Sequence, residues 1–266
     1  MENPNADTAT APVLRFDRDG ITELMFNDPD KYNTLSREVL DSMLSTLSAI
    51  AADEAVKVVV IAARGKAFCS GHNLKQMQEN RDSKYYKRLL TDCSTMMQAI
   101  VNLPQPVIAK VQGITTAAGC QLVATCDLAI AGRSSHFATN GINNGLFCAT
   151  PAVAVSRTVA RKHALEMLLT GDFIDAERAA EIGLINSSVE DIELDEAVNE
   201  LAAKLAAKSQ YALRLGKASF QRQLNQPLDA AYRSASNDLV CNLLAHDGIE
   251  GIDAFFEKRE PIWEND

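Results

Sequence analysis

A strand, a glycine-containing loop and a helix follow one another twice in this chain of 266 residues, and this repeat constrains the fold most. Residues 56–62 and 107–111 are rich in β-branched side chains and apolar on both faces, which is typical of buried parallel strands. Helix-forming segments at residues 84–101 and 117–124 follow the two loops. Because parallel strands need a crossover connection, the repeat predicts an α/β fold.

The neighbouring segments extend this pattern. Residues 13–26 form two short alternating runs around Asp19-Gly20, a dipeptide that favours a tight β-hairpin turn. Ser36 can cap the helix that follows it, because apolar residues recur there at spacings of three and four. One more strand is expected at residues 128–131.

The second half of the chain is almost entirely helix-forming, and no strand is expected from about residue 151 onward. Breaks in the helical pattern are indicated at Gly171, Gly183, Pro227 and Gly248. We expect residues 1–12 to be disordered, residues 13–200 to form the core and residues 201–266 to form a helical region. No linker rich in proline, glycine or serine separates these parts, so we expect one continuous body.

The charge balance argues against large anionic partners and leaves a small anionic ligand possible through a local cluster of Lys and Arg. The chain has 26 Lys and Arg residues against 35 Asp and Glu residues, a net charge of −9, so nucleic acid and anionic membranes meet a repulsive average field. No apolar stretch approaches the length of a membrane span. Residues 1–12 lack the apolar core of a signal peptide and the Arg-rich character of a transit peptide, so a cytoplasmic protein is expected.

The cysteines and histidines show no metal-binding pattern. The six cysteines make no CxxC pair, and the four histidines have no zinc-ligand spacing. We therefore expect reduced thiols and no bound metal ion.

Two loops offer backbone N–H groups to a ligand. Residues 66–72 and 113–120 carry small side chains where a strand leads into a helix. The first N–H groups of a helix have no intrahelical partner, and small side chains let a ligand oxygen approach them. Two such groups that converge on one carbonyl oxygen form an oxyanion hole, which stabilises an enolate. The alternative is that both are tight loops packed under helices.

Four blocks of sequence carry a resemblance to a known family. They are AFCSGHNLKQM at residues 67–77, PVIAKVQGITTAAGCQLVATCDLAIA at 106–131, LTGDFIDAERAAEIGLIN at 169–186 and AFFEKREPIW at 254–263. In this order they resemble the crotonase (enoyl-CoA hydratase/isomerase) superfamily. The resemblance implies a crotonase-type spiral of ββα units with a C-terminal helical region that completes a homotrimer or a dimer of trimers. It also implies an acyl-CoA substrate, with coenzyme A as part of that substrate and no tightly bound cofactor.

The resemblance assigns roles to individual residues. The oxyanion-hole donors would be the N–H groups of Ser70 and Ala118. The implied substrate-binding residues are Lys31, Tyr32, Gly71, His72, Asn73, Leu74, Gly119, Asn140, Lys258 and Arg259. Gly71 and Gly119 would begin the two helices, and residues 72–74 would line the adenine pocket.

The basic residues among these positions would supply local positive charge. Lys31 would lie near the CoA phosphates, and Lys258 and Arg259 would come from a neighbouring subunit. The alternative for each cation is a solvated surface position. His72 could titrate near neutral pH, and a packing role is its alternative.

The two glutamates that the family's hydratases use are missing at the matching positions, where this chain has Gln121 and Gly141. An amide exchanges no proton near neutral pH and glycine has no side chain, whereas a positioned acid or base contributes about 10²–10⁴-fold to a rate. We expect an enzyme that binds acyl-CoA and stabilises a thioester enolate, with atypical or weak hydratase activity. The alternative is a non-catalytic acyl-CoA-binding or scaffold protein.

Cys148 is a candidate substitute for the missing groups. It lies in a loop just before a predicted helix, and a helix N-terminus lowers the pKa of a thiol. The alternative is a small buried apolar residue, since free cysteine is among the most buried residue types.

Overall fold

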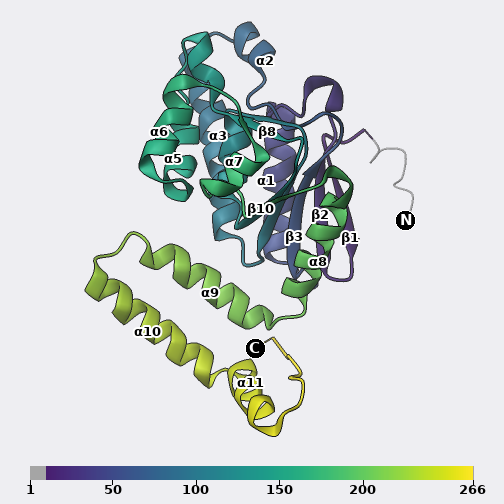
Figure 1. Ribbon diagram of the computed structural model, residues 1–266, viewed down its shortest axis with the longest axis vertical. Coiled ribbons are helices and arrows are strands. Elements are labelled where there is room, and N and C mark those ends of the chain that lie inside the picture. Colours follow the sequence, from purple (N-terminus) through teal and green to yellow (C-terminus); the bar gives the residue numbers. More distant parts are fainter. Residues whose placement is uncertain (1–9, 266) are drawn as a thin grey trace.

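The computed structural model describes residues 10–265 (Figure 1). The segment expected to be disordered, residues 1–12, lies outside the described residues except for its last three. Strands and helices are interspersed up to residue 206. Residues 210–265 form what we call the C-terminal arm, at the bottom of this view. Within the described range, no helix combines the length and apolar character that a membrane span requires.

A sheet of six strands, counted over residues 10–265, forms one layer of the core. In the order in which they lie side by side, its strands are β1 (Val13–Arg18), β2 (Ile21–Phe26), β3 (Val58–Ala63), β5 (Val107–Val111), β7 (Leu128–Gly132) and β10 (Ser187–Val189). β1 and β2 are antiparallel and meet at Asp19 and Gly20, which both have positive φ, so the predicted hairpin is confirmed. The other neighbours pair in parallel, as expected for β3, β5 and β7.

A smaller sheet holds the loops that were predicted to bind a ligand. Its strands are β4 (Ala67–Cys69), β6 (Ile114–Thr116), β8 (His136–Ala138) and β9 (Ile174–Asp175). β4, β6 and β8 are parallel, and each follows a strand of the larger sheet along the chain. The expectation of no strand beyond residue 151 is wrong, since β9 and β10 are short edge strands. β9 is a strand because it pairs with β8, and β10 because it pairs with β7. Neither has a strand pattern of its own in the sequence.

Helices complete these repeats and give the expected ββα units. The helices before the arm are α1 (Arg37–Ala51), α2 (Leu74–Glu79), α3 (Ser83–Asn102), α4 (Ala118–Thr125), α5 (Ala149–Thr158), α6 (Arg161–Thr170), α7 (Ala176–Glu181) and α8 (Leu194–Ala206). The Ser36 side chain accepts a hydrogen bond of 3.3 Å from the N–H of Val39, which confirms the predicted N-cap of α1. The boundary predicted after residue 200 falls inside α8.

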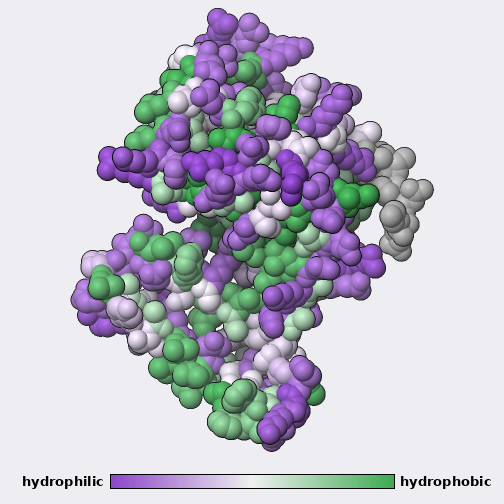
Figure 2. All heavy atoms as spheres, in the orientation of Figure 1, coloured by the Kyte–Doolittle hydropathy of each residue, from purple (hydrophilic) through white to green (hydrophobic). Residues whose placement is uncertain are grey.

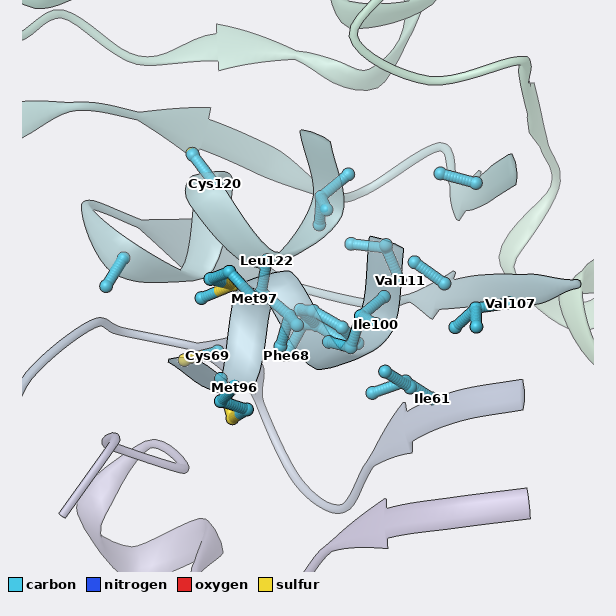
Figure 3. Close-up of a cluster of buried hydrophobic side chains, with 14 of the residues drawn as sticks. Ile61, Phe68, Cys69, Met96, Met97, Ile100, Val107, Val111, Cys120 and Leu122 are labelled. Carbon is cyan, nitrogen blue, oxygen red and sulfur yellow. The ribbon is translucent and has the colours of Figure 1, made fainter. Parts of the chain in front are cut away.

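The larger sheet is buried on both faces. On one face, Val111 lies near Ile100 of α3, in an apolar cluster that also holds Ile61, Val107 and Met96 (Figure 3). On the other face, a second apolar cluster joins the sheet to α8. Its buried members are Val58, Val60, Ile108, Ile130, Leu194, Val198 and Ala202. Burial on both faces explains why β3 and β5 have no alternation of polar and apolar residues.

The C-terminal arm consists of α9 (Gln210–Gln223), α10 (Leu228–Leu244) and α11 (His246–Glu257). Large apolar side chains remain exposed on it, and Figure 2 shows hydrophobic patches over its surface. They include Phe220, Leu224, Leu228, Tyr232, Leu239, Val240, Leu243, Leu244, Ile249, Ile252, Phe255, Phe256 and Ile262. The prediction that Gly248 breaks a helix is wrong. It lies inside α11, where a Cβ would collide with the carbonyl oxygen of Asn242.

Candidate active site

The two small-residue loops meet at the edge of the smaller sheet. β4 and β6 are paired, and the Thr116 hydroxyl donates a hydrogen bond of 3.1 Å to the carbonyl oxygen of Ser70. Gly71 has a φ of 86°, and a Cβ on it would lie 3.2 Å from the nitrogen of Ala118 and 3.0 Å from the Cβ of Ala117. Only glycine allows this backbone conformation and this close approach together. The structure therefore brings the two predicted loops into contact.

The N–H of Ser70 does not face a ligand. It donates a hydrogen bond of 3.1 Å to the carbonyl oxygen of Tyr32, so it is already used inside the protein. Among residues 10–265, neither the N–H of His72 nor that of Ala118 donates a hydrogen bond. Of the two donors inferred from the sequence, Ala118 is free and Ser70 is not. His72 carries the free N–H on this loop, and no local sequence signal separates it from Ser70.

The direction of the Ala118 N–H depends on the residue before it. Ala117 has φ 49° and ψ −114°, a backbone conformation that L-residues rarely adopt, and its own N–H donates to the carbonyl oxygen of Ala138 at 2.8 Å. Ala118 then occupies the first position of α4, where no intrahelical acceptor exists. The positive end of the helix dipole lies at the same place, so this N-terminus favours a partly negative oxygen.

Gln121 lies one helical turn beyond Ala118. It is only 4% exposed, and its side-chain oxygen Oε1 has no hydrogen-bond partner within the described part of the chain. Residues three apart share one face of a helix, and side chains lean toward the helix N-terminus. The amide of Gln121 therefore lies on the face of Ala118, and its buried oxygen lacks the partner that such a group normally has.

Gly141 lies where the protein leaves no room for a side chain. It belongs to the short helix η2 (Asn140–Asn144), which begins with the predicted ligand residue Asn140. A Cβ on Gly141 would lie 2.6 Å from the carbonyl oxygen of Leu146 and 2.8 Å from Sγ of Cys148. At the second position where the resemblance implies a glutamate, the Leu146 backbone and the Cys148 thiol therefore exclude any side chain.

The Cys148 thiol is buried, which agrees with the alternative of a small buried residue rather than with an activated thiol. Cys148 is the N-cap residue of α5 and is 8% exposed. Burial raises the pKa of its thiol, and a hydrogen bond from the N–H of Gly141 opposes this rise only in part. Loss of water around the thiolate therefore outweighs the helix N-terminus, because the charged form is the one that burial disfavours.

The adenine-pocket residues have mainly local roles in this structure. Burial lowers the pKa of His72 to about 4, so the imidazole is neutral at pH 7, which agrees with the alternative of a packing role. Asn73 caps α2, because its Oδ1 accepts a hydrogen bond of 3.1 Å from the N–H of Gln76. Leu74 is 56% exposed and lines a cavity.

That cavity has a volume of about 360 Å³ and a mainly apolar lining. It lies between α2 and α3, and its lining residues are Leu74, Met77, Gln78, Arg81, Tyr86, Leu89, Leu90 and Leu146. Leu74 comes two residues after His72, and the carbonyl of Leu146 faces Gly141. The cavity is therefore lined by one residue that follows the loop of His72 and by one that contacts Gly141. No local pattern in the sequence indicated it.

The basic residues inferred for CoA binding lie apart from each other. Lys31 is exposed and forms an ion pair of 2.9 Å with Asp28. Lys258 and Arg259 follow α11, at the opposite end of the molecule from α2 (Figure 1). Arg259 also donates two hydrogen bonds to Glu250, which lower the pKa of that carboxyl to about 2. Within one chain, neither residue reaches the site, and Arg259 is already paired.

No group of three or more histidine, cysteine or acidic residues that could hold a metal ion occurs in the described part of the chain.

Comparisons with known proteins agree on one family. The model of the enoyl-CoA hydratase/isomerase family matches residues 17–266. The rat enoyl-CoA hydratase domain-containing protein 3, mitochondrial, is 46% identical over 246 residues, which cover 92% of this chain and 82% of the rat protein. The human protein of the same name is also 46% identical, over 248 residues.

Solved structures show the same similarity. The crystal structure of human enoyl Coenzyme A hydratase domain-containing protein 3 has a TM-score of 0.92 and 46% identity, and covers 95% of this chain and 100% of that one. An enoyl-CoA hydratase from Mycobacterium smegmatis has a TM-score of 0.93 and 46% identity, and covers 95% of this chain and 98% of that one.

The expected cytoplasmic localisation is contradicted by these comparisons. The rat, mouse and human relatives are named as mitochondrial proteins. The expectation depended on the composition of residues 1–12, most of which lie outside the described residues. The compartment is set by targeting signals rather than by the folded domain.

Proposed function

This chain belongs to the enoyl-CoA hydratase/isomerase family and has the crotonase fold, and from that premise we propose that it binds an acyl-CoA thioester and polarises its carbonyl group. The observation that carries this proposal is the contact between the Gly71 turn and the free N–H of Ala118. The names of the vertebrate relatives support a mitochondrial protein.

The thioester oxygen binds between two backbone N–H groups. The donors in this proposal are His72 and Ala118, because the N–H of Ser70 is used by Tyr32. Preorganised donors act where negative charge develops, so they stabilise the enolate more than the ground-state thioester. The dipole of α4 adds to this effect at Ala118.

Ordinary hydration is weak or absent in this proposal. The amide of Gln121 has no exchangeable proton near neutral pH, and Gly141 has neither a side chain nor space for one. A missing acid or base typically costs about 10²–10⁴-fold in rate. Polarisation of the carbonyl does not depend on these groups, so binding and enolate stabilisation remain.

The acyl chain occupies the apolar cavity of about 360 Å³ between α2 and α3. Apolar pockets beside a few convergent polar groups are the usual form of small-molecule sites. Coenzyme A enters as part of the substrate, and in this proposal its phosphates meet Lys31. This residue precedes Tyr32, whose carbonyl oxygen accepts a hydrogen bond from the N–H of Ser70.

The exposed apolar side chains of the C-terminal arm support assembly into a homotrimer or a dimer of trimers. Contiguous apolar surface of this extent on soluble proteins usually marks an interface. In the assembly, Lys258 of one chain can approach the CoA of its neighbour. Sedimentation equilibrium checks the assembly, and a monomer at micromolar concentration would contradict it.

Titration with a conjugated dienoyl-CoA tests the proposed site. Polarisation of the carbonyl extends the conjugation, so the absorbance of the bound thioester moves to longer wavelength. Gly71→Ala places a Cβ against the Ala118 nitrogen and is expected to abolish this shift. Gly183→Ala is the matched control, since Gly183 has a similar φ of 81° but its nearest contact is at 3.7 Å.

The outcomes separate the enzyme from the scaffold alternative. A red shift together with slow conversion of crotonyl-CoA supports an enzyme with weak hydratase activity. A red shift with no product from enoyl-, acyl- and carboxyacyl-CoA supports a binding protein. No binding of any acyl-CoA would refute the proposal.

A further inference from the structure

The loop after β4 is held by a segment from another part of the chain. Residues 28–35, which we call the supporting segment, bind this loop through their backbone. The carbonyl oxygen of Tyr32 accepts a hydrogen bond of 3.1 Å from the N–H of Ser70. The N–H of Leu35 donates a hydrogen bond of 2.8 Å to the carbonyl oxygen of Gly71. These contacts fix the direction of the backbone at Ser70 and Gly71.

The second of these hydrogen bonds determines where the N–H of His72 points. The carbonyl of Gly71 and the N–H of His72 belong to the same peptide group. This group is planar and trans, so its C=O and N–H point in opposite directions. The N–H of Leu35 holds the carbonyl on one side, and the N–H of His72 therefore faces away from the supporting segment. A β-bridge between Leu35 and His72 agrees with this arrangement.

One buried side chain, Asn33, fixes the shape of the supporting segment. Asn33 is 1% exposed and has a φ of 52°, in the left-handed region where asparagine is enriched. Its Oδ1 accepts a hydrogen bond of 3.0 Å from the N–H of Asp28. Its Nδ2 donates hydrogen bonds of 2.8 Å to the carbonyl oxygen of Arg64 and 2.7 Å to that of Ala67, the first residue of β4. One amide thus uses its acceptor and both donors to join the supporting segment to the strand that leads into the loop.

We infer that Asn33 is a positioning residue for the oxyanion donor at His72, which it aims through Leu35 and Gly71. The inference rests on the proposed function, because it concerns the same thioester carbonyl. Asn33 is buried and both polar atoms of its amide are bonded within the chain, so it acts through the backbone rather than on the thioester. Hydrogen bonds weaken steeply when they are misaligned, and a donor that stabilises developing charge must be preorganised. Loss of the Asn33 amide should therefore reduce polarisation of the carbonyl more than it reduces binding.

Titration of Asn33 variants with 2,4-hexadienoyl-CoA tests this inference, because the red shift of the bound thioester reports the polarisation of its carbonyl. Asn33→Asp has the same shape but turns an acceptor toward the two carbonyl oxygens. Asn33→Gly keeps the left-handed backbone conformation and removes the amide. In both variants the red shift is expected to fall by about half, since one of two donors is misaligned. The dissociation constant is expected to stay within about fivefold of the wild-type value, the effect of one neutral hydrogen bond.

Gln105→Glu is the matched control. Gln105 is 8% exposed, and its Nε2 donates hydrogen bonds to the carbonyl oxygens of Ile50 and Asp53, at 3.1 and 3.4 Å. The substitution removes the same kind of bond from a buried place at the end of α1 opposite to the supporting segment. It should lower stability but leave the red shift at the wild-type value. The red shift is read at saturation, so it does not depend on the fraction of protein that is folded.

The outcomes are distinct. A full red shift in Asn33→Gly overturns the inference and leaves Asn33 with a purely structural role, and this variant decides alone if Asn33→Asp does not fold. An equal loss of red shift in Gln105→Glu overturns the inference as well, because the loss would then follow stability. If the wild-type protein does not bind the thioester, or binds it without any red shift, the proposed function itself fails.

Discussion

Cys148 fills the space that a side chain on residue 141 would need. Its Sγ would lie 2.8 Å from a Cβ on Gly141, and the Gly141 N–H donates a hydrogen bond to the same thiol. The carbonyl of Leu146 closes the space from another direction, at 2.6 Å. Glycine at position 141 is therefore required by the packing of this loop, and a glutamate cannot be placed there without moving the backbone.

Gly141→Ala is expected to destabilise the protein by about 1–3 kcal/mol, the usual cost of adding an atom where the packing leaves no space. Urea unfolding measures this. Gly216→Ala is the control, because Gly216 lies in α9 with nothing within 4 Å of an added Cβ. There the substitution should raise stability by about 0.5–1 kcal/mol. An unchanged urea midpoint for Gly141→Ala would contradict the packing described here.

The Cys148 thiol should react slowly in the native protein. Burial raises its pKa and limits access, and only the thiolate is nucleophilic. We expect alkylation by iodoacetamide at pH 8 to be at least about tenfold slower at Cys148 in the native protein than in urea. Peptide mapping by mass spectrometry gives both rates. Equal rates would revive the hypothesis of a nucleophilic thiol.

The imidazole of His72 makes stability depend on pH. Its folded-state pKa is about 4, below the value of about 6.5 in an unfolded chain, so the unfolded state binds more protons between these values. The free energy of unfolding therefore falls as the pH decreases from 6.5 to 4, by up to about 3 kcal/mol from this residue. His72→Gln should lack this contribution. Urea unfolding of both proteins across this range measures the difference, and parallel curves would exclude a buried neutral His72.

Ala117 stores backbone strain at the entrance of α4. A φ of 49° with ψ of −114° suits glycine, and such outliers cost about 1–3 kcal/mol. Ala117→Gly should therefore raise stability by about 1 kcal/mol, although glycine normally destabilises. Ala203→Gly, on the exposed side of α8, should lower it by about 1 kcal/mol. Thermal unfolding of the two variants compares their stabilities. An equal loss of stability in Ala117→Gly and Ala203→Gly would show that Ala117 is unstrained.

Lys217 of α9 joins the C-terminal arm to the core through hydrogen bonds and an ion pair. Its Nζ lies 2.6 Å from Oδ2 of Asp127 and also donates to the carbonyl oxygens of Ile100 and Gln105. Burial raises the pKa of Asp127 in spite of this ion pair. Lys217→Met leaves a buried carboxylate without its partner, and should cost about 3 kcal/mol in urea unfolding.

A second substitution checks the cause of this loss. Adding Asp127→Asn to Lys217→Met removes the unpaired charge and should recover part of the stability. Lys204→Met, at an exposed position of α8, should change stability by less than about 0.5 kcal/mol. If the double variant is as unstable as Lys217→Met alone, the ion pair is not the reason for the loss.

The sequence by itself determined the elements whose signals are local. The Asp19-Gly20 turn, the Ser36 cap and the strand at residues 107–111 follow from backbone preference, side-chain capping and burial on both faces. The family resemblance was readable for the same reason, since its motifs are continuous blocks. Gln121 and Gly141 were likewise visible, as the residues at the two positions where the resemblance implies glutamates.

Only the tertiary structure decided which of these groups are available for chemistry. The N–H of Ser70 is used by Tyr32, which the chain brings from a distant loop, so the free N–H belongs to His72. The pKa of Cys148 rises because neighbouring segments remove water from its thiol. Hydrogen-bond partners and solvent exposure depend on contacts between residues far apart in sequence, and the short strands β9 and β10 exist only through such contacts.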